Sequence, residues 1–166
     1  MFIYPEKTRF HTEPAEIGPG PWHHRSDCFV CRKQEGIEPP PTGGYIVEGK
    51  YFFVEHAPLK MSHVGTAIIQ SRRHLLDFGE MTSAESTEFG SIMRRLVPAV
   101  KAVTGAHRIY FLSVNEHAPH FHLWPVPKKK NTTLEPLPFL SRRPVPATKS
   151  GAETMLRKIR KKLGRS

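Results

Sequence analysis

The 166-residue sequence has only two cysteines, no long apolar run and no internal repeat. Two cysteines cannot build the disulfide framework of a small secreted domain. No segment reaches the roughly 18 consecutive apolar residues that a transmembrane helix needs. The first residues lack a charged region followed by an apolar stretch, so no secretory signal is expected. We therefore expect one cytoplasmic domain with a single core.

Basic residues outnumber acidic residues only in the C-terminal part of the chain. Residues 1–127 hold 13 basic and 13 acidic side chains, whereas residues 128–166 hold 12 basic and 2 acidic ones, which accounts for the net charge of +10. Such a tail is typical of a solubilising end or of a weak polyanion-binding arm. Apolar residues at helical spacing among basic ones predict a basic amphipathic helix over residues 152–163. It could dock on the body, on a partner or on an anionic surface.

The apolar pattern predicts an α+β fold. Segments rich in β-branched and aromatic residues predict strands at 45–47, 51–54, 65–69, 108–114 and 120–124. Between the third and fourth strands, Thr82 and Glu85 form a capping box that opens a long amphipathic helix ending at Gly105, with a kink expected at Pro98. This order indicates a mainly antiparallel five-stranded sheet with one long helix on a face. We expect an irregular lead-in at 1–27, a folded domain at 28–128, and a Pro-rich linker with the basic helix at 129–166.

Two short motifs point to chemistry. The pair Cys28-x-x-Cys31 is compatible with zinc binding, with redox chemistry or with two structural thiols. His120 and His122 alternate on a predicted strand, so both side chains are expected on one face. For this segment alone, a polar strand edge is the alternative.

Residues 120–128, HFHLWPVPK, resemble the signature of the histidine-triad (HIT) nucleotide-binding family. That signature alternates histidine and apolar residues and usually ends in a proline and a basic residue. Further matches lie upstream, in the same order as in the family, at 62–69, 71–78, 81–85 and 114–116. The likeness therefore covers roughly residues 27–128. It implies a HIT-like fold. Proteins of this family are often two-fold dimers, which makes a homodimer an expectation.

The resemblance implies a nucleotidyl hydrolase or transferase that acts at a nucleotide α-phosphate. His122 matches the nucleophile, which forms a covalent nucleotidyl-histidine that water or another acceptor resolves. The third triad position is Trp124 instead of histidine. Galactose-1-phosphate uridylyltransferases, a related branch, have glutamine there, so transfer stays open. The alternatives are a nucleotide-binding module without catalysis and a HIT protein that its basic tail directs to nucleic acid.

The resemblance also implies ligands for a metal and for the nucleotide. Cys28, Cys31, His74 and His120 would form a closed Cys2His2 site for a structural zinc ion, which would fix the strand that displays His122. Glu55, at the end of the second strand, would hold ribose hydroxyls, with a solvated strand-end glutamate as the alternative. The other nucleotide-binding candidates are Asn115 and His117 on the phosphate side and Trp124. An apolar base slot is expected from Tyr51, Phe53 and Ile69, unless these belong to the core.

Overall fold

The computed structural model describes residues 27–114, 118–135, 139–140 and 145–164. The short helix α1 comes first, two strands, a 3-10 turn (Leu59–Met61) and a third strand follow, and a second 3-10 turn (Phe78–Glu80) leads into the long helix α2. Two strands and the C-terminal helix α4 complete the chain. The bounds are α1 Phe29–Gln34, β1 Val47–Glu48, β2 Phe52–His56, β3 Ala67–Ser71, α2 Ser83–Thr104, β4 Ala106–Leu112, β5 His122–Lys129 and α4 Lys149–Leu163.

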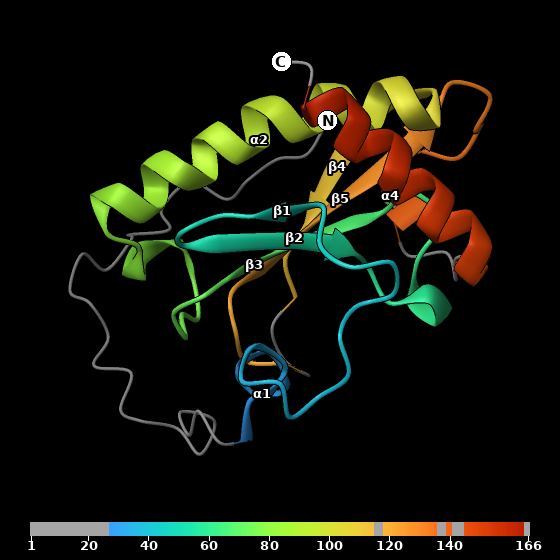
Figure 1. Cartoon of the computed structure of the whole chain (residues 1–166). Helices are drawn as coiled ribbons and strands as arrows, with labels where there is room; N and C mark the ends of the chain where they lie inside the picture. Colours follow the sequence, from blue (N-terminus) through green and yellow to red (C-terminus); the bar gives the residue numbers. More distant parts are fainter. Residues whose placement is uncertain (1–26, 115–117, 136–138, 141–144, 165–166) are drawn as a thin grey trace, which may run out of the picture.

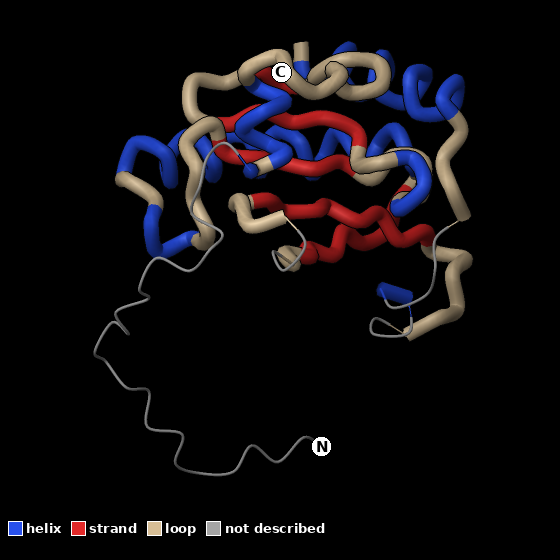
Figure 2. The backbone as a smooth tube through the Cα atoms, turned by 90° about the horizontal axis from the view of Figure 1, so that it is seen from below, coloured by secondary structure: helices blue, strands red, loops and turns tan. Residues whose placement is uncertain are grey.

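The five strands form one antiparallel sheet in the order β1-β2-β3-β5-β4. Helices α2 and α4 lie on one side of this sheet and α1 lies on the other (Figure 1). Viewed from below, the strands run side by side across the molecule (Figure 2). The predicted α+β architecture, with five antiparallel strands and one long helix on a face, is confirmed.

Successive side chains of a strand point to opposite faces of the sheet, and the two faces have different surroundings. The register places Val54 opposite Ile69, and both belong to the main core beneath the long helices. The next pair, Glu55 and Ile68, faces the side of α1 instead. One face of the sheet therefore stabilises the fold, and the other is left to build a site.

Helix α2 begins as the sequence predicts. The backbone N–H of Glu85 donates to Thr82 Oγ1 at 3.3 Å, and the Glu85 carboxylate accepts from the backbone N–H of Thr82 at 2.7 Å, which completes the capping box. The helix ends at Gly105, whose φ of 70° is left-handed and favours glycine. It continues through Pro98 as one helix.

Helix α4 docks on the body. Its apolar residues Leu156, Ile159 and Leu163 are buried in the main core. Arg95 of α2 donates to the Leu163 carbonyl at 2.9 Å, and Arg160 donates to the Tyr45 carbonyl at 2.7 Å. Of the three alternatives for the basic helix, the structure therefore has docking on the body. No helix in the described part of the chain is long and apolar enough to cross a membrane. The segment boundaries at 27/28 and 128/129 stay predictions.

Two differences from the sequence prediction bear on the site. Helix α1 was not predicted, because six residues carry too few turns for a periodic signal. Strand β5 begins at His122 and extends to Lys129, so His120 precedes the strand. Pro125 and Pro127 are tolerated there because β5 pairs with β3 only through His122 and Leu123, while the later residues pair with β4 alone.

Candidate functional site: a Cys2His2 cluster beside an apolar cavity

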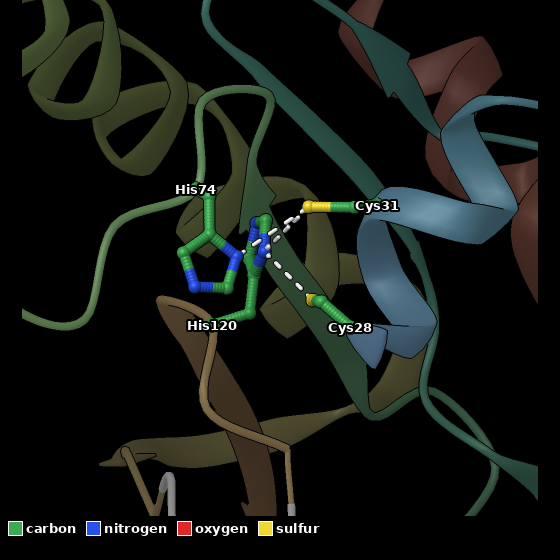
Figure 3. A group of neighbouring side chains, drawn as sticks. All are labelled: Cys28, Cys31, His74 and His120. Atoms are coloured by element: carbon green, nitrogen blue, oxygen red, sulfur yellow. Dashed lines mark hydrogen bonds between the residues drawn. The ribbon is translucent and has the colours of Figure 1, made fainter. Parts of the chain in front are cut away.

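Four side chains from three parts of the chain converge on one point (Figure 3). Cys28 caps α1 and Cys31 lies within it, His74 follows β3, and His120 precedes β5. Their four ligand atoms all lie within 4.8 Å of one another. Both cysteines are buried, and neither forms a disulfide. The residues that the sequence predicts as one metal site therefore do come together.

The distances in the cluster fit a tetrahedral ion. Zinc bonds of about 2.3 Å to sulfur and about 2.05 Å to nitrogen imply a sulfur-to-nitrogen separation of about 3.6 Å at a tetrahedral angle. The Cys28 sulfur lies 3.3 Å from His120 Nδ1, the Cys31 sulfur 3.7 Å from the same atom and 3.4 Å from His74 Nδ1. Two soft thiols and two imidazoles at these spacings form the donor set of a structural zinc site.

Hydrogen bonding fixes the tautomer of His120. Its Nε2–H donates to the Ser71 carbonyl at 2.8 Å, which leaves the lone pair on Nδ1, the atom that faces the thiols. Burial lowers the pKa of His120 to about 4, so the ring is neutral near pH 7. A neutral imidazole whose far nitrogen is held by a carbonyl is the form that ligates metals.

His122 has the opposite arrangement. Its Nδ1 lies 2.8 Å from the carbonyl oxygen of His120, which can only accept, so Nδ1 carries the proton and Nε2 carries the lone pair. The His122 ring is part of the wall of a cavity of about 580 Å³ on the α1 side of the sheet. The hydrogen bond therefore holds the ring in one tautomer in the cavity wall.

Trp124 occupies the same wall, two residues along β5. Its ring centroid lies 6.3 Å from that of His122, with the planes at 60°. Both residues line the cavity, so the indole lies beside the imidazole without separating it from the cavity. An indole offers one N–H donor and cannot act as acid or base, so position 124 contributes shape and at most one donor to the cavity wall.

Glu55 lies in the cavity wall as well, but it is buried and not a solvated strand-end residue. Its Oε1 accepts from Lys33 Nζ at 2.6 Å. No residue in the described ranges pairs with Oε2. Burial raises the pKa of Glu55, and the adjacent Lys33 ammonium opposes that rise.

Some predicted site residues lie elsewhere. Asn115 and His117 fall outside the described residues. None of the three residues predicted for a base slot lines the cavity: Ile69 lies in the main core with Tyr51 packed against it, and Phe53 packs with the cysteines of α1. The apolar walls come instead from residues that the sequence analysis missed, among them Phe29 and Phe139, which lie in segments without a periodic signal.

Comparison with known proteins rests on solved structures, since no protein-family model and no curated protein matches the sequence. A Zn-bound histidine triad family protein from Mycobacterium smegmatis aligns at TM-score 0.64 and 18% identity, covering 86% of this chain and 96% of that one. A hypothetical histidine triad nucleotide-binding protein from Sulfolobus tokodaii aligns at TM-score 0.64 and 14% identity, covering 83% and 93%. A Hit-like protein involved in cell-cycle regulation from Bartonella henselae gives TM-score 0.64 and 12% identity over 82% and 96%.

The chain has the histidine-triad fold. At these identities the likeness shows the fold alone. Within the histidine-triad fold this chain keeps histidine at the first two triad positions, His120 and His122, and has Trp124 at the third.

Proposed function

We propose that this protein is a nucleotide hydrolase or nucleotidyltransferase of the histidine-triad type, acting at an α-phosphate through His122. The observation that carries the proposal is the hydrogen bond from His122 Nδ1 to the His120 carbonyl, with the ring in the wall of the cavity. That bond places the lone pair on Nε2. A cavity of about 580 Å³ is within the usual range of small-ligand sites.

The reaction proceeds in two displacements. Nε2 of His122 attacks the α-phosphorus, so an N–P bond forms and the bond to the leaving group breaks with its electron pair. Water or another acceptor then attacks the same phosphorus, the N–P bond breaks with its electron pair returning to Nε2, and the proton of the acceptor passes to solvent, which restores the imidazole. Trp124 cannot protonate the leaving group, and among the described residues this leaves His122 as the reacting residue at the triad.

Polar atoms in the cavity wall suit a ribonucleotide. Glu55 Oε2 is an acceptor without a partner among the described residues, and the Thr66 hydroxyl, which also lines the cavity, has no described partner either. Buried polar groups are costly unless they are hydrogen-bonded. We assign Glu55 to the vicinal hydroxyls of the ribose, because a carboxylate accepts from both.

We also propose that Cys28, Cys31, His74 and His120 hold a structural zinc ion. The two thiols and two imidazoles supply four donors and leave no open position, which distinguishes a structural site from a catalytic one. When bound, the ion fixes the segment that leads into β5. The carbonyl of His120 then keeps its position against His122.

A labelling experiment tests the catalytic proposal. Incubation of the full-length protein with a dinucleoside polyphosphate, a nucleotide sugar or a nucleoside phosphoramidate should give an acid-labile nucleotidylated protein, detected by intact mass. His122→Ala should abolish the adduct, while the matched control His107→Ala, an exposed histidine on β4, should retain it. Nucleotide binding that survives His122→Ala, with no adduct or turnover on any substrate, would identify a binding module instead.

One observation favours a second candidate function, contact with nucleic acid. The apolar face of α4 is buried in the core, so the helix cannot insert it into a bilayer. Its outer face presents exposed cations with no ion pair to a described residue: Arg157, Lys158, Lys161 and Lys162. This face lies across the sheet from α1 (Figure 1), so nucleic-acid phosphates bound there would not occupy the cavity.

A homodimer and a cytoplasmic location complete the proposal. Sedimentation of the purified protein tests the first, and fractionation of the source cells tests the second.

A further inference from the structure

Lys33 is a buried lysine on α1. Its side chain is 3% exposed, and its ammonium lies 2.6 Å from Glu55 Oε1 and 3.0 Å from Gln70 Oε1. The rings of Phe29 and Phe53 flank the same ammonium at 5.8 and 5.4 Å. Lysine is almost never fully buried unless it is paired, because a charge removed from water is costly. The ammonium therefore has a specific partner in Glu55, and the two charges compensate each other.

The ion pair forms part of the candidate site. Lys33, Glu55 and Gln70 all line the cavity that contains His122. In the sheet register Gln70 lies directly opposite His122, and such cross-strand neighbours have their side chains on the same face. Lys33 thus links Glu55 to Gln70, the cross-strand neighbour of His122.

The two carboxylate oxygens of Glu55 differ in their contacts. Oε1 is held by Lys33, whereas Oε2 has no partner among the described residues. The Glu55 side chain is more than nine-tenths buried, so without a nearby cation its charged form would be strongly disfavoured. The Lys33 ammonium stabilises the charged carboxylate against the cost of burial, and its hydrogen bond holds Oε1 while Oε2 has no partner among the described residues.

We propose that Lys33 is a positioning residue that determines ribose specificity by holding Glu55 ionised, with Oε2 free for the vicinal hydroxyls of a nucleotide. The inference rests on the proposed assignment of Glu55 to the ribose. A carboxylate accepts two hydroxyl donors, whereas a neutral carboxylic acid has one oxygen engaged as a donor. The preference for ribonucleotides over nucleotides without these hydroxyls should therefore depend on a lysine that does not touch them.

The test compares dissociation constants of ribonucleoside and 2′,3′-dideoxyribonucleoside monophosphates, measured by calorimetry on the full-length, zinc-loaded protein. The unmodified protein should bind the ribonucleotide about tenfold to a hundredfold more tightly, as expected for hydrogen bonds to a charged group. Lys33→Met should reduce this preference to near unity, and Lys33→Arg should restore part of it. Lys50→Met, at an exposed lysine of the β1–β2 turn, is the matched control and should keep the preference.

A double variant keeps the test decisive where Lys33→Met unfolds because it strands a buried charge. Lys33→Met/Glu55→Gln removes both charges, and it is compared with Glu55→Gln alone. If Lys33 acts through Glu55, the two variants bind both nucleotides with equal affinities. A further loss in the double variant, or a folded Lys33→Met protein with an unchanged preference, overturns the inference.

Failure of the proposed function gives a different result. In that case the unmodified protein shows no preference between the two nucleotides, or binds neither. Loss of the Glu55 assignment is then visible before any lysine variant is measured.

Discussion

Removal of the metal should destabilise the protein through α1. This helix has six residues, well below the roughly 12–15 that make even a good isolated helix marginal. Its anchors are Val30, packed in a small cluster with Phe53, the Lys33–Glu55 ion pair, and the two cysteines that close on His74 and His120. A chelator removes the ion that joins α1 to the segments carrying His74 and His120. The fold of the long helices does not depend on it.

The magnitude follows from mass action. A ligand at a thousand times its dissociation constant stabilises the folded state by about 4 kcal/mol. For a chain of 150–250 residues, each kcal/mol changes the melting temperature by about 2–4 °C, so chelation should lower it by about 8–16 °C. Differential scanning calorimetry with and without chelator measures the shift, and elemental mass spectrometry of the purified protein should find one zinc ion per chain.

Variants of the ligands give the matched comparison. Cys31→Ser should lose the zinc and melt at the temperature of the chelated protein, and chelator should have no further effect on it. His74→Ala should behave in the same way, whereas His107→Ala, an exposed histidine of β4, should retain one zinc ion. A protein that purifies without metal and melts at the same temperature with chelator would refute the assignment, and so would full zinc occupancy in Cys31→Ser.

Three further predictions concern the packing of α4, the cap of α2 and the exposed basic face of α4. Leu156→Ala should lower the free energy of unfolding in urea by about 2–5 kcal/mol, because this side chain is fully buried beneath α4; a free tail would show no change. The Arg73 guanidinium and the helix cap hold the pKa of Glu85 at about 2, so its stabilising effect is present above about pH 4.5 and is lost as the pH falls toward 2. Glu85→Gln should remove that contribution and flatten the melting temperature between pH 2 and 5, and an unaltered profile would contradict the pairing. Lys158→Glu/Lys162→Glu should weaken binding of single-stranded RNA and reduce the salt slope by about 1.4, two contacts at about 0.7 each, with nucleotide turnover unchanged; Lys50→Glu/Lys60→Glu carries the same charge change elsewhere.

The strands, the long helix and the metal ligands were predictable for different reasons. Strand and helix signals come from local periodicity, and the capping box of Thr82 and Glu85 marks one boundary directly. The four ligands lie up to 92 residues apart, and no local pattern connects Cys28 to His120. They were found through the resemblance to the histidine-triad family, and the structure brings them together.

Local patterns could not reveal the walls of the cavity. A strand presents alternate residues to opposite faces, but the sequence does not say which face is the core. Phe53 and Ile69 both read as apolar strand residues, yet the register sends Ile69 to the long helices and Phe53 to α1. Phe29 and Lys33 belong to a helix too short to show a period, and their role depends on packing against β2.

His120 serves both halves of the site with different atoms. Its side chain faces the thiols through Nδ1, while its backbone carbonyl accepts the proton-bearing nitrogen of His122. Any ion that fixes the ring also fixes the carbonyl, because the two are separated by a few bonds in one residue. The tautomer of His122 is therefore set by the carbonyl of a residue in the metal cluster, and Trp124 takes no part in that hydrogen bond. For this reason tryptophan at position 124 leaves the tautomer of His122 unchanged. In the proposed reaction its effect would be on the departure of the leaving group, which an indole cannot protonate, and on the access of the second acceptor.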